Sequence, residues 1–251
     1  MSLTPPFSSA SPALDAPSAS AQAVVLFAMA TLAERRDADT ESHLLRMQGY
    51  VRALAQALQR LPALAPIITP DYVAHLLQGV LVYDIGTLAI PERILLKPGR
   101  FTFEERSTMQ SHAVRGHQAL VRAETTCGAS DPWLDMAKQL ALSHHEHWDG
   151  QGYPQQLAGE AIPLCARIVA VADVYDAMVS NKVYKAGITH AQAVEQICAE
   201  RGAQFDPQVV DAFVACAAEI EQVARRHADT EADLQDKMET LAEAIAEHAV
   251  M

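Results

Sequence analysis

The feature that most constrains the fold is the helical spacing of apolar residues along most of the chain. From residue 21 onward, stretches rich in Ala and Leu place apolar side chains three and four residues apart, as at Leu44, Met47, Val51, Leu54 and Leu58. The run 167–179 is rich in Val and Ile and by periodicity alone also fits a strand. No alternating segment exists to pair with it, so we interpret it as a buried helix. The sequence therefore predicts an all-α fold.

Capping residues and breakers divide the chain into elements. Helices are predicted from Pro70-Asp71 through Val82, after the capping box Thr102–Glu105 toward Glu124, from Asp131-Pro132 to Ser143, from Asp206-Pro207 toward His227, and from Thr230 and Asp233 onward. Prolines and glycines predict irregular loops at 85–100 and 149–163.

Length and composition predict one domain with short appendages. A chain of 251 residues with 50% hydrophobic residues buries a large core. Residues 1–20 are rich in Ser, Pro and Ala without periodicity, and we expect them to be disordered. The predicted organisation is a tail at 1–20, a domain at 21–228 and an acidic helix at 229–251.

Charge and apolar runs exclude some classes of partner. The net charge of -12 repels polyanions, which argues against general nucleic-acid binding. The longest apolar run, 23–33, is about half of what a bilayer crossing needs, and no basic segment precedes it. The four cysteines form no C-x-x-C pair and suggest a reducing compartment. We expect no membrane association and a cytoplasmic location.

The C-terminal helix carries an apolar stripe on an acidic background. The stripe repeats at intervals of four and three residues, at Leu234, Met238, Leu241, Ile245 and His248, and Lys237 is the only basic residue beside it. Two interpretations stay open, because two heptads are marginal alone. The stripe either packs on its own domain or forms a homodimer.

Histidines beside carboxylates form the clearest chemical signal. The pair His144-His145, followed by Glu146 at a helix end, presents imidazoles that can bind one or two cations. A polar helix end that faces water explains this pair equally well.

Longer motifs resemble the HD-GYP family, a branch of the HD metal-dependent phosphohydrolases. The segment 144–154 reads HHE-x-WDG-x-GYP, and upstream lie Asp84-Ile85-Gly86 and the stretch ILLKPG at 94–99. His112 and Gly116 fit the family's H-x-x-x-G, and residues 166–177 fit its ARI...ADVYDA helix. Residues 37–229 are covered. The resemblance implies an HD-type helical bundle with a long GYP loop and hydrolysis of cyclic di-GMP.

The resemblance also implies the metal ligands. One metal is expected on His43, the HD pair at 83–84 and Asp173. A second is expected on Asp84, which bridges, with His112, His144 and His145. Asp39 lies at the position of a third-metal ligand. The ions implied are Fe or Mn, two per chain or else one or three; Ni and Zn suit the same ligands.

Two positions depart from the family pattern. The HD histidine is Tyr83 here, and a phenol with a pKa near 10 is a poor ligand at neutral pH. The position of the family's catalytic lysine holds Thr87 here, so a positive charge is missing where charge develops in the transition state. We expect this loss to lower the rate about 100-fold or more.

Other positions concern substrate and partners. By resemblance Lys182 and Lys185 contact the dinucleotide, although solvated lysines explain them too. Tyr153 is expected at the edge of the active site, and the loop Gly152-Tyr153-Pro154 is implicated in docking diguanylate cyclase domains. Arg46 and Tyr50 share the face of His43 and either line the cavity or form supporting contacts.

Three hypotheses follow. The first is a domain that binds metal and cyclic di-GMP, or a related phosphodiester, with hydrolysis weakened or lost through Tyr83 and Thr87. The second is an active phosphodiesterase with an altered first metal site, which hydrolyses cyclic di-GMP to pGpG or GMP, or hydrolyses another phosphate ester. The third is a docking module without catalysis.

Overall fold

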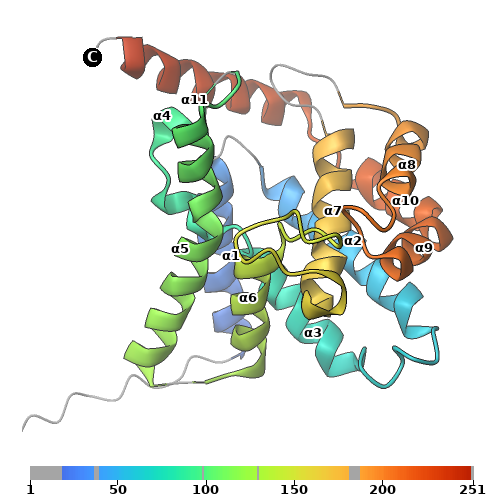
Figure 1. Cartoon of the computed structure of the whole chain (residues 1–251). Coiled ribbons are helices and arrows are strands. Elements are labelled where there is room, and N and C mark those ends of the chain that lie inside the picture. The colour runs from blue at the N-terminus through green and yellow to red at the C-terminus, as the bar shows by residue number, and fades with distance from the viewer. Residues whose placement is uncertain (1–18, 37–39, 98, 129, 181–186, 250–251) are drawn as a thin grey trace, which may run out of the picture.

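The computed structural model describes residues 19–36, 40–97, 99–128, 130–180 and 187–249 (Figure 1). These residues form eleven α-helices and three short 3₁₀ helices, with no strand among them, which confirms the predicted all-α fold. The helices are α1 (Ala19–Arg36), α2 (Glu41–Gln59), α3 (Pro70–Gly79), η1 (Val80–Val82), η2 (Ile85–Ala89), α4 (Glu92–Leu95), α5 (Phe103–Cys127), α6 (Pro132–Ser143), η3 (Gly159–Ala161), α7 (Leu164–Val179), α8 (His190–Ala199), α9 (Pro207–Ala215), α10 (Ala217–Arg226) and α11 (Glu231–Ala249).

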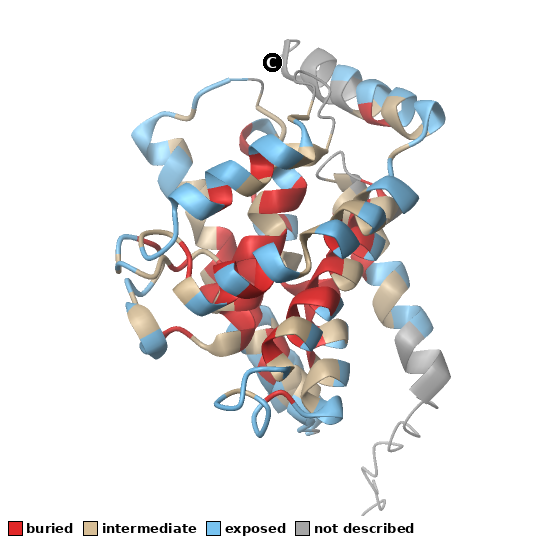
Figure 2. Ribbon diagram, turned by 90° about the vertical axis from the view of Figure 1, so that its right-hand side faces the viewer, coloured by how far each residue is buried: buried red, intermediate tan, exposed pale blue. Residues whose placement is uncertain are grey.

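The core is organised around the packing of α7 against α2. Helix α7 is mostly apolar, as expected for a helix at the centre of a bundle, and its charged residues are Arg167, Asp173 and Asp176. Its side chains from Cys165 to Ala172 are almost all buried, and Leu54 and Leu58 of α2 are fully buried. Figure 2 shows these buried segments at the centre of the bundle. The prediction of a buried helix at 167–179 is confirmed.

The remaining helices surround this centre and place the site between them. Helix α5 packs along α6 and η2, and α6 packs against α3 and α7. On the other side of α7, α8 packs on α7 and α9, while α9 and α10 pack on α2 (Figure 1). The middle of α5, the end of α6, the junction of η1 and η2, and α7 therefore converge on one region.

Several helix ends follow the capping signals of the sequence. The Thr102 side chain accepts a hydrogen bond from the Glu105 backbone, and the Glu105 side chain accepts one from the Thr102 backbone. Asp131 caps α6 in the same way, through the backbone N–H of Trp133. Both predicted starts are correct because capping depends on residues that are close in sequence.

Two predictions of the chain's organisation are wrong. Residues 85–100 are not an open loop, because they contain η2 and α4, whose Ile94 and Leu95 form a small cluster with Ile90. The helix expected from Pro207 to His227 is broken at Cys216 into α9 and α10. The break lets both helices pack against α2.

The C-terminal helix forms as predicted, and Lys237 is the buried residue among its described side chains. Lys237 is 3% exposed, whereas Met238 of the stripe is 52% exposed. The side chains of Leu241, Ile245 and His248 lie outside the described part of the chain, as do residues 1–18 of the expected disordered tail. The homodimer and the domain boundaries at 20 and 228 stay predictions.

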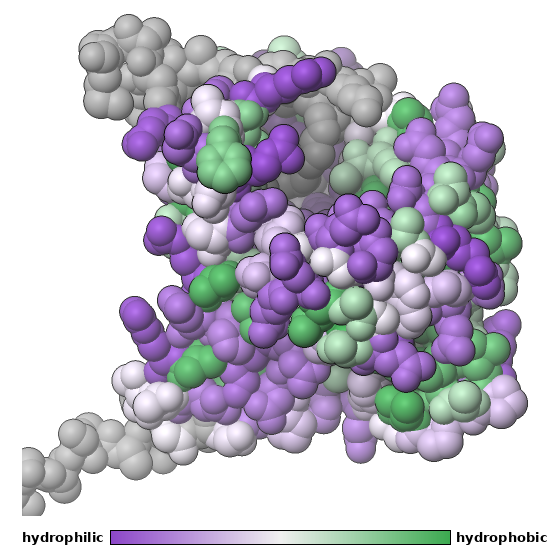
Figure 3. Space-filling view, in the orientation of Figure 1, coloured by the Kyte–Doolittle hydropathy of each residue, from purple (hydrophilic) through white to green (hydrophobic). Residues whose placement is uncertain are grey.

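One apolar segment, Pro70–Ala89, is long enough to cross a membrane by length and composition. In the structure it is divided into α3, η1 and η2, and Leu76 and Val80 belong to the main core cluster. Its apolar character is explained by this packing. The outer face seen in Figure 3 is largely hydrophilic, with scattered apolar residues.

Candidate metal centre

Four predicted metal ligands from three separate segments meet at one point. Asp84 lies between η1 and η2, His112 lies in the middle of α5, and His144 and His145 follow the last turn of α6. Each offers one ligand atom, and these atoms all lie within 4.8 Å of one another. The structure thus brings together all the residues expected for the second metal.

Two of the imidazoles are held in a fixed orientation by backbone carbonyls. Nδ1 of His112 donates to the Met109 carbonyl at 2.7 Å, and Nδ1 of His144 donates to the Leu140 carbonyl at 2.8 Å. With the proton on Nδ1, each Nε2 carries a lone pair that faces Asp84. The two Nε2 atoms lie 3.5 Å apart. Metal-binding histidines are commonly oriented in this way.

Asp84 Oδ1 lies 3.2 Å from Nε2 of His112 and 3.3 Å from Nε2 of His144. This oxygen is buried and has no hydrogen-bond partner. Burial raises the pKa of Asp84, but the neighbouring His112 and His144 lower it well below its usual range. Burial lowers the pKa of His112, and Asp84 raises it above its ordinary value. The point between these groups therefore favours a positive charge, which a metal ion bound by these N and O ligands supplies.

His145 completes the cluster and contacts the GYP loop. Burial, and then the charge of His144, lower its pKa well below the ordinary value, so its lone pair is available. The ring of Tyr153 stacks on it with centroids 4.7 Å apart. Gly152 is also buried, and a Cβ there would lie 2.3 Å from the backbone nitrogen of His147. Only glycine fits at this point of the loop.

Glu146, although next to the histidine pair, directs its carboxylate to the GYP loop. Its carboxylate accepts hydrogen bonds from the backbone N–H groups of Gln155 and Leu157, at 2.7 and 3.0 Å. Pro154 lies on the segment between Tyr153 and these two residues. A buried carboxylate thereby fixes the loop against the end of α6.

The residues expected for the first metal are joined by hydrogen bonds through Tyr83. Its hydroxyl donates to Oδ1 of Asp173 at 2.7 Å and lies 3.2 Å from Nε2 of His43. Burial, and then the charges of Asp173 and Asp84, raise the pKa of Tyr83 well above its ordinary value. The phenol is therefore a protonated hydrogen-bond donor rather than an anionic ligand.

Asp176, which the sequence analysis did not single out, supports His43. It accepts a hydrogen bond from Nδ1 of His43 at 2.8 Å, from Nε and Nη2 of Arg46, and from the Tyr50 hydroxyl at 3.0 Å. Burial raises the pKa of Asp176, but His43 and then Arg46 lower it well below the usual range. Arg46 and Tyr50 are thus supporting contacts of His43.

Of the remaining predicted site residues, the structure describes Thr87 but not Asp39, Lys182 or Lys185. Thr87 is buried, and its hydroxyl donates to the Asp84 carbonyl at 2.8 Å. Asp39, Lys182 and Lys185 lie outside the described residues. Glu34, which no motif marked, has a carboxylate oxygen 4.0 Å from Nε2 of His43.

The family model of the HD domain matches residues 31–209, and this range contains every site residue discussed above. The chain belongs to the HD domain family. The cluster of four candidate ligand residues and the GYP loop place it in the HD-GYP branch, which consists of metal-dependent phosphohydrolases.

Two curated relatives from Vibrio cholerae serotype O1 are similar to the chain. One, named probable cyclic di-GMP phosphodiesterase, is 44% identical over 84% of this chain and 48% of its own length. The other, named cyclic di-GMP phosphodiesterase, is 47% identical over 76% of this chain and 39% of its own length. The chain therefore spans less than half of either relative. A solved cyclic GMP-AMP specific phosphodiesterase of V. cholerae has the same fold, with a TM-score of 0.53 at 19% identity over 89% of this chain and 59% of that one.

Proposed function

We propose that this domain binds one transition metal and cyclic di-GMP, or a related cyclic dinucleotide, and hydrolyses it weakly or not at all. The observation that carries the proposal is the contrast between the two sites. One site has four converging ligands around a buried carboxylate oxygen without a partner. In the other, the protonated hydroxyl of Tyr83 bonds to Asp173.

The metal is expected at Asp84, His112, His144 and His145, as Fe or Mn. A metal bound there supplies a Lewis acid for a phosphodiester oxygen and lowers the pKa of a water molecule. The carbonyl-bound Nδ1 atoms keep the imidazoles in the orientation that this requires. Asp84 keeps 30% of its side chain exposed, which leaves the cluster open to a substrate.

Weak hydrolysis follows from two side chains. Tyr83 holds its proton between His43 and Asp173, where a family member has a metal-binding histidine. Thr87 directs its hydroxyl to a backbone carbonyl and supplies no cation to the scissile phosphate. Arg36 cannot replace the missing lysine in this position, because its guanidinium donates to the carbonyls of Thr87, Leu88 and Ile90.

The docking alternative receives less support from the loop. Tyr153, the most prominent side chain of the loop, stacks on His145 instead of extending toward a partner. The proposal also includes contact of Lys182 and Lys185 with the dinucleotide, binding of diguanylate cyclase domains, and homodimer formation. We also place the domain in the cytoplasm, where its free cysteines stay reduced.

The test is turnover of cyclic di-GMP by protein purified anaerobically and supplied with Fe(II) or Mn(II), with separation of pGpG from GMP. Wild type is compared with a Tyr83→His, Thr87→Lys variant, and Asp84→Asn is the inactive control. Cyclic GMP-AMP is a second substrate. We expect wild type to bind both metal and dinucleotide and the double variant to turn over at least 100-fold faster. Equal rates would favour an active enzyme with an altered first site, and no dinucleotide binding would favour the docking module.

A further inference from the structure

A chain of buried ion pairs joins the C-terminal helix to the first metal site. Nζ of Lys237 donates to Oδ2 of Asp229 at 2.7 Å. The other oxygen of Asp229 accepts hydrogen bonds from Nη1 of Arg46 at 3.2 Å and from the hydroxyl of Thr40 at 2.8 Å. The side chains of Lys237, Asp229 and Arg46 are each no more than 4% exposed.

The inner half of this series of ion pairs ends at His43. Nε and Nη2 of Arg46 donate to the two oxygens of Asp176 at 2.7 and 2.9 Å. Oδ2 of Asp176 accepts a hydrogen bond from Nδ1–H of His43 at 2.8 Å. This hydrogen bond directs Nε2 of His43 toward Tyr83. Paired carboxylates and cations thus alternate from α11 to the imidazole, with Arg46 at the midpoint.

We propose that Lys237 and Asp229 are positioning residues that hold His43, through Arg46 and Asp176, with its Nε2 lone pair directed into the first metal site. This inference rests on the proposed function, in which the Tyr83 hydroxyl takes the place of a metal at the first site, and it concerns the residues that orient His43 rather than the metal ligands. The C-terminal helix then contributes a residue that orients His43, although it lies outside residues 31–209 of the family match.

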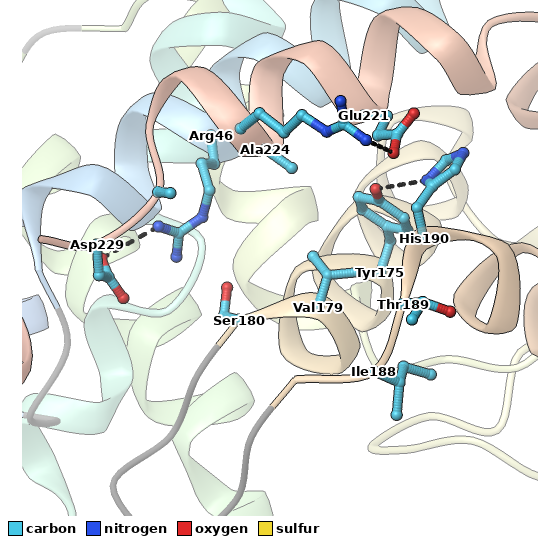
Figure 4. Close-up of a pocket in the computed structure, with 12 residues that line it drawn as sticks. Arg46, Tyr175, Val179, Ser180, Ile188, Thr189, His190, Glu221, Ala224 and Asp229 are labelled. Carbon is cyan, nitrogen blue, oxygen red and sulfur yellow. Dashed lines mark hydrogen bonds and ion pairs between the residues drawn. The ribbon is translucent and has the colours of Figure 1, made fainter.

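Arg46 needs such an anchor because it borders a cavity. A pocket of about 390 Å³ lies between α2, α7, α8 and α10, and Arg46, Asp229 and Ser180 are among its lining residues. Figure 4 shows the guanidinium of Arg46 at the edge of this space, with Asp229 beside it. Nη1 of Arg46 also donates to the His227 carbonyl at 3.0 Å, so Asp229 and this carbonyl together hold it, and loss of Asp229 would give the side chain room to shift toward the pocket. The contact of Arg46 with Asp176 would then loosen.

The location of Lys237 supports a specific role. It is the only Lys or Arg among residues 229–251, and a lysine on an acidic helix ordinarily stays in water. Here it is 3% exposed and neutralises Asp229 instead. Loss of Lys237 leaves the buried Asp229 with the Arg46 guanidinium as its remaining cation among the described contacts, and this loss of positive charge has to be relieved by rearrangement. The neighbours that can rearrange are Arg46 and, through it, Asp176.

The test uses the metal-free full chain with ¹⁵N-labelled histidine, so it does not depend on turnover. Long-range NMR correlations report which ring nitrogen of His43 carries the proton. We expect wild type to hold the Nδ1–H form, and Lys237→Met to shift His43 toward a mixture of tautomers while the signals of His112 and His144 stay unchanged. The control is Lys138→Met, because Lys138 likewise forms ion pairs within the chain, with Glu124 and Asp135, but between α5 and α6.

Unchanged His43 signals in a folded Lys237→Met variant would overturn the proposal. So would an equal change in Lys138→Met. If Lys237→Met does not fold, the pair Lys237→Met with Asp229→Asn removes both charges together and is measured instead, with the same expectation. A second readout is metal affinity in a Tyr83→His background, where Lys237→Met should weaken the first site about 10- to 100-fold and leave the second unchanged. Failure of hydrolysis in every variant would count against the proposed function alone.

Discussion

The hydroxyl of Tyr83 lies between two residues expected to bind the first metal, 2.7 Å from Oδ1 of Asp173 and 3.2 Å from Nε2 of His43. A histidine nitrogen and a carboxylate oxygen that face a common point are suited to share a metal ion. Here the phenol occupies that point with a proton. The first site is therefore organised around a hydrogen bond, whereas the second is organised around a carboxylate oxygen without a partner.

Replacement of Tyr83 by histidine is expected to restore metal binding at the first site. The variant removes the donor that bonds Asp173 and adds an imidazole, so metal content should rise by about one equivalent per chain. Elemental analysis after anaerobic loading measures this. Tyr72→His is the control, because its hydroxyl is also buried but lies away from the cluster. Identical metal content in wild type and Tyr83→His would contradict the assignment.

Removal of the Asp84 carboxylate is expected to abolish stabilisation by metal. A ligand that binds only the folded chain stabilises it by about 2.7 kcal/mol at 100 times its Kd. Thermal unfolding with Mn(II) and with a chelator should therefore differ for wild type and coincide for Asp84→Asn. Asp173→Asn should keep the difference, because Asp173 is not part of the four-residue cluster. A metal-dependent shift that survives in Asp84→Asn would place the metal elsewhere.

The packing of η2 on α5 predicts a sharp requirement for glycine at position 86. A Cβ on Gly86 would lie 1.9 Å from the His112 carbonyl oxygen and 2.6 Å from the Gly116 nitrogen. Gly86→Ala must separate Asp84 from His112, and we expect a loss of about 3 kcal/mol or more in the free energy of unfolding. Gly128→Ala meets no atom within 4 Å and has only its φ of 63° to overcome, at about 1 to 2 kcal/mol. Urea titrations compare the two, and equal losses would refute the steric argument.

The cysteines are expected to differ strongly in reactivity. Burial raises the pKa of Cys165 to about 12, so roughly one thiol in ten thousand is ionised at pH 8. Cys127 and Cys198 are exposed. Alkylation of the native protein at pH 8, followed by peptide mass spectrometry, should label the two exposed thiols and reach Cys165 only after unfolding. Labelling of all three at similar rates would show that Cys165 is accessible in solution.

Much of the fold could be predicted because its signals are local. The capping box at Thr102 and the Asp131-Pro132 start are each contained within four residues, and both helices begin where expected. The start of α8 has the same kind of signal, Thr189 with Gln192, which the sequence analysis overlooked. The break at Cys216 has no comparable pattern, because it depends on how two helices fit against α2.

The features of the candidate site likewise separate into those that the sequence predicts and those that depend on the tertiary structure. The sequence by itself determined the family and the expected ligands of the second metal, since the motifs around His112 and His144 fix residue types at short spacing. Only the tertiary structure decided that Tyr83 donates to Asp173, 90 residues away, and that Lys237 is turned inward onto Asp229. Asp176, whose partner Arg46 is 130 residues distant, belongs to the same group. The physical reason is that burial and hydrogen bonding between distant segments depend on how the helices pack, which residue spacing along the chain does not specify.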